Sequence, residues 1–420
     1  MGGAAATARA RFDQISDRRW VKALTLALLL GFAILLPFLF ETGSPFLDDC
    51  VLALAYVTMA LGLNVIVGYA GLLDLGYVAF FAIGAYTMGW LGSGFFDGAE
   101  NGEGFHVLVG SPASEIPGIH LNFVVILVFA VLFTVMAGIA IGLPTLRLRG
   151  DYIAVVTLAF GEIVGRIAIN GNDIRIGGIW DSTLGALPLI PTLGSEATLT
   201  AGKQGVTPVD KVDLPFAEPF GALNLRPWYL VALALVVLAI FVSWRLRDSR
   251  QGRAWIALRE DEVAAASMGV PLVRTKLLAY GIGAAFGGVA GAFLGSYLNT
   301  VNADQFQFSF SIFILAMVIL GGLGSIKGVV VGALALSFLN NRLIPDVLNG
   351  LPSDLGLDFD LTQVSFGIFG FILVIVMVLR PEGLFPERRR QQEFKGVGAG
   401  HTEMEGRAEP ERGPGPSGHT

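Results

Sequence analysis

Long apolar runs, separated by short polar or glycine-rich stretches, fill this chain from residue 22 to residue 380. A helix that crosses about 30 Å of hydrocarbon needs roughly 20 apolar residues. Ten runs approach that length: 22–40, 50–68, 74–93, 121–143, 151–169, 227–244, 277–299, 308–325, 326–344 and 363–380. The pattern therefore predicts an all-α, polytopic membrane helix bundle with about ten transmembrane segments.

Two pairs of runs meet at glycine-rich stretches, around Gly68–Asp74 and around Gly324–Lys327. Irregular backbone at membrane depth is tolerated where protein or a water-filled cavity surrounds it. Each pair is therefore either two full crossings or one broken, re-entrant helix, and the pattern leaves both alternatives open.

Composition excludes a soluble protein. Hydrophobic residues make up 54% of the chain, charged residues only 15%, and the mean hydropathy is +0.67. A soluble core of this length would bury far less apolar surface. The single cysteine, Cys50, excludes an internal disulfide, and no second thiol or histidine cluster suggests a role for it beyond packing.

The distribution of Lys and Arg predicts the orientation. Most of the 28 basic residues lie in alternate loops, whereas segments 94–120 and 345–362 contain no Lys or Arg. Cytoplasmic loops carry the excess of basic residues, so the N- and C-termini are both expected in the cytoplasm.

This orientation divides the chain into three parts. Residues 1–21 form a cytoplasmic N-terminal segment and 22–380 form the transmembrane domain. Residues 381–420 are rich in charge, Gly and Pro and poor in apolar residues, which predicts a cytoplasmic, largely disordered tail. Within the domain, 170–226 is a substantial extracytoplasmic loop.

The basic loop at about 245–276 lies on the cytoplasmic side in this orientation. Within it, Ala257–Met268 is expected to form a helix of about three turns that ends at Gly269. The acids Glu260, Asp261 and Glu262 lie near its start, where the helix dipole favours negative charge. The helix is either a solvated link between two spans or a docking element for a cytoplasmic partner.

Ionisable and polar residues inside the apolar runs are the other candidates for function, because charge within the bilayer is costly. Glu162 and Arg166 are four residues apart and share one helix face. They either form an ion pair that fixes the rotation of the helix or lie on a solute path. Asp74 either caps a broken helix or shapes the pathway, and Asn64, with Tyr69, either satisfies freed backbone groups there or packs the helices.

Enzyme chemistry has no support in the sequence. No paired catalytic carboxylates, nucleophile motif or phosphate-binding GxxxxGK[ST] loop is present. The four histidines are scattered through loops without metal-ligand spacing. We therefore expect no catalytic residue, no metal site and no cofactor bound by this chain.

Four stretches, in order, carry a family resemblance. They are Gly62–Tyr86, Leu146–Ile163, Arg259–Val270 followed by Lys276–Tyr280 and the Gly/Ala-rich 281–295, and Gly321–Gly328. Together they resemble the LivM-type permeases of branched-chain amino acid ABC importers, over about residues 50–385. The chain departs from the family at Arg175–Trp180 and in its long tail.

The resemblance implies an EAA-type coupling loop at Arg259–Gly269, in which seven residues contact an ATPase. These residues are Arg259, Glu260, Asp261, Glu262, Ala264, Ala265 and Gly269. It also implies a second permease subunit, two cytoplasmic ATPases that use ATP, an extracytoplasmic solute-binding protein and a bacterial inner-membrane location. Membrane lipid surrounds such a protein, and no nucleic acid is involved.

Two other functions compete with this one. A permease for urea or a short amide would look closely similar. An ion-coupled secondary transporter would also have about ten spans and broken helices, but it would not need the helix in the cytoplasmic loop. A bulky residue in place of Gly269 is expected to uncouple ATP turnover from uptake in the ABC importer alone.

Overall fold

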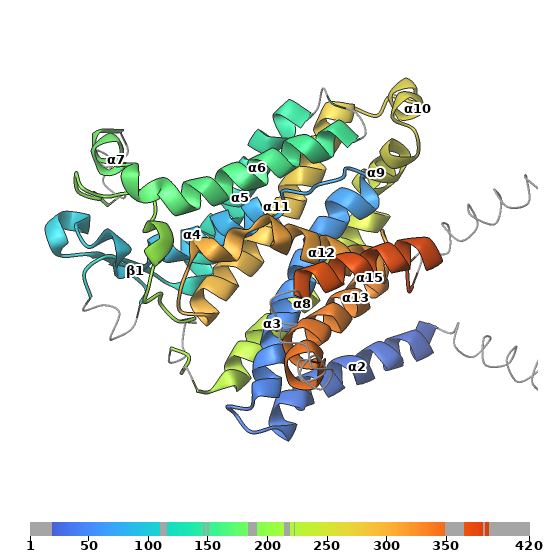
Figure 1. Ribbon diagram of the computed structural model, residues 1–420, viewed down its shortest axis with the longest axis horizontal. Coiled ribbons are helices and arrows are strands. Elements are labelled where there is room, and N and C mark those ends of the chain that lie inside the picture. The colour runs from blue at the N-terminus through green and yellow to red at the C-terminus, as the bar shows by residue number, and fades with distance from the viewer. Residues whose placement is uncertain are drawn as a thin grey trace, which may run out of the picture.

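A computed structural model describes residues 19–109, 116–145, 148, 151–183, 191–213, 219–221, 223–348, 365–380 and 383–385. Most of these residues belong to a helical bundle (Figure 1). The predictions for residues 1–18 and for the tail from residue 386 lie outside the described part of the chain.

All ten predicted runs fall on helices. The helices are α2 (Arg19–Leu39), α3 (Pro45–Leu63) continued by the π-helix η1 (Asn64–Tyr69), α4 (Val78–Leu91), α5 (Phe123–Thr145), α6 (Asp151–Asn170), α8 (Leu225–Asp248), α11 (Leu272–Tyr297), α12 (Phe308–Gly321), α13 (Ile326–Phe338) continued by the π-helix η8 (Leu339–Leu348), and α15 (Ser365–Leu379).

Six stretches of the described chain are long and apolar enough to cross a membrane. They are Pro45–Tyr69, Phe123–Thr145, Tyr152–Asp173, Leu225–Asp248, Leu272–Tyr297 and Ile326–Pro345. Four apolar helices are shorter: Ala27–Leu39, Val78–Leu91, Phe308–Gly321 and Gly367–Val376. The helical bundle is confirmed, and the count of ten crossings stays a prediction.

Helix α11 lies at the centre of the bundle and packs against α3, α4 and α5. Glycines permit the close approach. A Cβ at Gly84 of α4 would lie 2.3 Å from the Gly288 carbonyl oxygen, and one at Gly138 of α5 would lie 2.9 Å from the Tyr280 carbonyl oxygen. Small residues of this kind are typical where apolar helices pack in a membrane.

Both glycine-rich stretches break a helix. After η1, residues 70–77 are not helical, and α4 then begins at Val78. Between α12 and α13, Gly322 and Gly324 adopt positive φ angles of 115° and 84°, which favour glycine. Ser325 then caps α13 by accepting a hydrogen bond from the Gly328 N–H at 3.1 Å.

A small mixed β-sheet, with one antiparallel and one parallel strand pair, is an exception to the all-α prediction. Its strands are β1 (Gly92–Ser93), β2 (Phe105–Val107) and β3 (Ile119–Leu121), in the order β1-β3-β2. Strands this short carry no readable alternation, which is why the sequence did not predict them. We call segments 92–107, 119–121, 171–183 and 191–213 the cap.

The cap also holds several short helices. These are η2 (Gly94–Phe96), η3 (Ala99–Gly102), η5 (Gly171–Asp173), α7 (Gly177–Thr183) and η6 (Gly202–Gln204), while η7 (Ala303–Phe306) precedes α12. The predicted loop 170–226 therefore contains folded structure.

The cap and the basic loop lie at opposite ends of the bundle. In Figure 1, β1 and α7 lie at the left, whereas α9 (Arg250–Glu260) and α10 (Glu262–Ser267) lie at the upper right. The start of α2 and the end of α15 point toward the same side as α9 and α10. The first and the last helix of the described bundle therefore have their outer ends on the side of the basic loop.

Candidate functional site

The predicted loop helix 257–268 is wrong as a single helix, because the chain forms α9 and α10 with a break at Asp261. Asp261 has an extended backbone, and its Oδ1 accepts hydrogen bonds from the N–H groups of Val263 at 2.8 Å and Ala264 at 2.9 Å. This is the geometry of an N-cap. Of the three acids, Glu260 ends α9, Asp261 caps α10 and Glu262 begins α10.

Buried polar contacts fix α9 and α10 to the start of α11. Trp255 is fully buried, and its Nε1 donates to the Thr275 carbonyl at 2.8 Å. The Lys276 ammonium lies 2.7 Å from a Glu262 carboxylate oxygen, and the two side chains are 3% and 29% exposed. The Lys276 side chain is therefore shielded from solvent, whereas Glu262 is partly exposed. Trp255 and Lys276 were not among the predicted site residues.

The seven predicted coupling residues divide into two groups. Glu260, Asp261, Ala264 and Gly269 are exposed, together with Val263 and Met268 at 62% and 86%. Arg259, Glu262 and Ala265 instead face the bundle and hold the segment in place. The exposed set is the surface that a cytoplasmic partner could contact.

Gly269 ends α10 with a φ of +83°, and a Cβ there would meet no atom within 4 Å. The position needs glycine because of its backbone conformation and not because of crowding. The effect of a bulky residue at Gly269 on coupling stays a prediction. Within this chain any side chain there would strain the backbone, whatever its size. Asn, which tolerates positive φ, is expected to be milder than Ala.

Arg259 connects α9 to the first helix break. Its guanidinium Nη1 donates to the Gly68 carbonyl oxygen at 2.7 Å. Gly71, with a φ of +70°, lies against the same side chain, and a Cβ there would come within 2.4 Å of the Arg259 Cγ. The arginine therefore lies against the backbone of the break.

Asn64 connects this break to the second one. Its Oδ1 accepts a buried hydrogen bond from the Gly324 N–H at 2.8 Å. A Cβ at Gly68 would lie 2.6 Å from the same Gly324 nitrogen, so the two breaks are in direct contact. We call Asn64, Gly68, Gly71, Arg259 and Gly324 the joint. Asn64 was predicted to act with Tyr69 on backbone groups of the first break. It instead accepts from a backbone N–H of the second break, and the Tyr69 hydroxyl has no hydrogen-bond partner among the described residues.

Asp74 lies in the nonhelical stretch after η1. It is 2% exposed, and its Oδ1 accepts from the Gly76 N–H at 2.9 Å. The neighbouring Thr157 of α6 accepts from the Leu75 N–H at 3.1 Å. Asp74 thus stabilises the turn that leads into α4. Its second oxygen has no hydrogen-bond partner in the described structure.

Glu162 and Arg166 do not form the predicted ion pair. Both side chains are exposed on α6, and no ion pair joins them among the described residues. Asn170, one further turn along, is exposed as well, and its side chain donates to the Arg166 carbonyl at 3.1 Å. Asp173 in η5 continues the same row. We call Glu162, Arg166, Asn170 and Asp173 the polar row.

A hollow of about 580 Å³ lies at the cap end of the polar row. Its walls come from the end of α6, from η5 and from the segment that ends in η6. The polar residues that line it are Asn170, Asn172, Asp173, Thr198, Thr200, Lys203 and Gln204.

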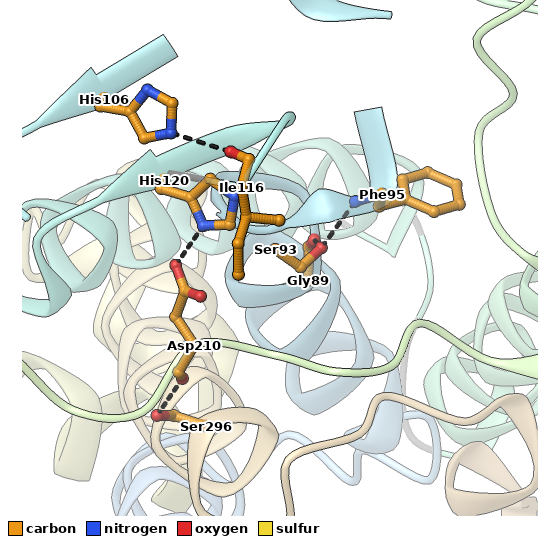
Figure 2. Close-up of polar contacts among 8 residues, drawn as sticks. All are labelled: Gly89, Ser93, Phe95, His106, Ile116, His120, Asp210 and Ser296. Atoms are coloured by element: carbon orange, nitrogen blue, oxygen red, sulfur yellow. Dashed lines mark hydrogen bonds and ion pairs between the residues drawn. The ribbon is translucent and has the colours of Figure 1, made fainter. Parts of the chain in front are cut away.

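A histidine pair fixes another part of the cap to the bundle (Figure 2). His120 of β3 has its Nδ1 2.6 Å from an Asp210 carboxylate oxygen, and the Ser296 hydroxyl at the end of α11 donates to the Asp210 carbonyl at 2.7 Å. His106 of β2 stacks on His120 with centroids 5.2 Å apart. No pattern in the sequence predicted this pairing, and the described residues hold no group of three or more potential metal ligands.

Comparison with known proteins gives a consistent match. A family model described as "Branched-chain amino acid transport system / permease component" matches residues 47–378. The high-affinity branched-chain amino acid transport system permease protein LivM of Escherichia coli K12 is 37% identical over 378 residues, which cover 89% of this chain and 77% of the relative.

Two further relatives extend the comparison. The probable branched-chain amino acid transport permease protein LivM of Methanocaldococcus jannaschii is 26% identical over 79% of this chain and 91% of its own length. The permease protein LivH of Escherichia coli K12 is 28% identical over 40% of this chain and 49% of its own length. No solved structure matches the chain.

Proposed function

The chain belongs to the family of branched-chain amino acid permeases of ABC importers, and from this we propose how it works. It carries branched-chain amino acids across the bacterial inner membrane. An extracytoplasmic binding protein delivers the solute at the cap, and two separate ATPases act on α9 and α10. The chain binds no cofactor itself, and its partners use the ATP.

The joint is the observation that carries the coupling mechanism. Val263 and Met268 present apolar surface next to exposed acids at the end of the bundle that holds α9 and α10. Through the bond from Arg259 to Gly68, a movement of α9 acts on η1. Through the bond from Asn64 to Gly324, it also acts on the α12–α13 break. ATP binding favours one access state by the difference in its interaction energy with the two states.

The polar row supports a second permease subunit. Charge near the centre of a bilayer costs on the order of 3 kcal/mol per residue unless it faces protein or water. Glu162 and Arg166 lie within the candidate span Tyr152–Asp173 and are exposed in the single chain. A related permease that covers this face would place the polar row along a water-filled path between two subunits.

The remaining elements fit the same arrangement. Ten crossings, with both termini and the loop 245–276 in the cytoplasm, place the cap on the outside, where a binding protein approaches. The positions of α2, α15 and α9 at one end of the bundle support this orientation (Figure 1).

The test is purification of the tagged chain in mild detergent, followed by identification of co-purifying proteins and by uptake assays in proteoliposomes. We expect a second permease and two ATPases, and leucine uptake that requires ATP. The variant Val263→Asp/Met268→Asp should lose the ATPases, because both side chains are exposed and the buried supports of α9 and α10 stay intact. The matched control is Ile179→Asp, a 70% exposed position in the cap, which should retain them.

Other results would redirect the assignment. Recovery of the chain alone, with leucine uptake driven by an ion gradient, would indicate a secondary transporter. ATP-dependent uptake of urea or a short amide, with no leucine uptake, would keep the ABC mechanism and change the solute.

A further inference from the structure

The polar row follows one face of α6 and continues into η5. Its members are spaced by four, four and three residues, which places them on the same side of a helix. All four side chains are exposed. The row begins within the candidate span and ends at the hollow in the cap.

The charges of this region are not paired with one another. No ion pair in the described structure includes Glu162, Arg166, Asp173 or Lys203, whereas the neighbouring Arg175 lies 3.2 Å from a Glu196 carboxylate oxygen. Arg175 shows that exposed charges in this cap do pair when a partner is in reach. The four unpaired charges are free to meet a charged ligand.

The charges fall into two groups, each with one acid and one base. Asp173 and Lys203 both line the hollow, and Glu162 and Arg166 lie one helical turn apart on α6. Arg166 and Asp173 are seven residues apart, which corresponds to about 10 Å along a helix. The neutral amides of Asn170 and Asn172 lie at the hollow between them.

We propose that these two groups are successive binding stations for the α-amino and α-carboxylate groups of an amino acid. In the outer station, Asp173 binds the ammonium and Lys203 the carboxylate. In the inner station, Glu162 and Arg166 do the same. The volume of the hollow, about 580 Å³, is within the range of small-molecule sites. The proposal rests on the proposed function and names the residues that bind the charged groups of the amino acid.

The side chain of the solute has a different environment. The hollow has Ile169 and Ala201 as its apolar residues, too few to distinguish among apolar side chains. The stations therefore recognise the charged end that all such amino acids share, and selection among side chains falls to the binding protein.

The test uses the assembled complex in proteoliposomes with leucine-loaded binding protein. We expect Asp173→Asn and Lys203→Gln each to lower the rate of leucine uptake about tenfold, because each removes one charged contact. The swapped variant Asp173→Lys/Lys203→Asp should recover much of the rate, since the hollow again holds one acid and one base. Arg175→Gln, next to the hollow, is the matched control and should transport normally.

Two results would overturn the proposal. One is a wild-type rate in both single variants. The other is that weaker binding between the complex and the binding protein explains the whole loss of uptake, and that the swapped variant does not restore this binding. That result would make the hollow a protein-docking surface. Co-purification of the ATPases is measured in the same preparations. If the ATPases do not co-purify with the wild-type chain, the proposed function is refuted. If they co-purify and the single variants take up leucine at the wild-type rate, the stations alone are refuted.

Discussion

The joint and the polar row treat polar groups in opposite ways. In the joint, Arg259 and Asn64 each form a hydrogen bond to backbone, and the nearby Lys276 is ion-paired. In the polar row, charged side chains are exposed and unpaired within the described structure. Satisfied polar contacts fix relative positions, whereas unpaired charges await a ligand or another subunit. In our proposal, the joint transmits movement and the polar row receives solute.

The largest expected effect comes from the contact between the first break and α6, the helix that carries most of the polar row. A Cβ at Gly76 would lie 1.9 Å from the Thr157 carbonyl oxygen of α6. We expect Gly76→Ala to force the first break away from α6 at a cost of about 3 kcal/mol, seen as a lower thermal unfolding midpoint in detergent. Gly178→Ala is the control, since a Cβ there meets no atom within 4 Å. Equal midpoints for the two variants would show that α6 and the break are not tightly packed.

The second effect tests whether the ion pair between Glu262 and Lys276, near the joint, stabilises the fold. Glu262→Gln leaves the 3% exposed Lys276 side chain without its counter-charge. The expected destabilisation is about 2 kcal/mol, below the 3–5 kcal/mol typical of fully buried pairs because Glu262 is partly exposed. The double variant Glu262→Gln/Lys276→Met should recover part of the loss in the same unfolding measurement. A double variant less stable than the single one would contradict this account.

The third effect is on coupling. Arg259→Ala should leave ATP hydrolysis by the complex near its normal rate and lower leucine uptake per ATP by about tenfold, because a charged hydrogen bond between α9 and the break is lost. Arg253→Ala is the matched control, since the Arg253 side chain is exposed and donates to the nearby Asp248 carbonyl at 3.0 Å. A proportional fall in both activities would indicate damage to assembly and would argue against a role in transmission.

The smallest effect is at the exposed pair beside the polar row. Arg175 and Glu196 are 68% and 79% exposed. Removal of this pair by Arg175→Ala should change the free energy of unfolding by less than about 1 kcal/mol, and less still at high salt. A larger change would mean that the cap depends on surface charge more than its exposure suggests.

The helices could be predicted because runs of apolar residues are a local property, and the ten runs fall on helices. The break at Asp261 also had a local signal, since Asp is a strong N-cap residue, but the continuous alanine-rich pattern concealed it. The spacing of Glu162 and Arg166 permitted a pair without requiring one.

The joint had no local signal. Arg259 meets Gly68 across 191 residues and Asn64 meets Gly324 across 260. Periodicity shows which face of a helix is apolar, but it does not show which distant backbone group a polar side chain will reach. The same limit applies to Trp255 and to the stacked histidines of the cap, whose contacts depend on the tertiary fold.

The bond between Asn64 and Gly324 has a consequence for how the chain is made. Asn64 emerges from the ribosome 260 residues before its partner, and at typical rates of synthesis that interval is roughly 10 to 50 s. Throughout this time the side-chain oxygen of Asn64, buried in the finished protein, lacks the backbone N–H that donates to it there. The first break is therefore completed only late in translation, after most of the chain has already entered the membrane.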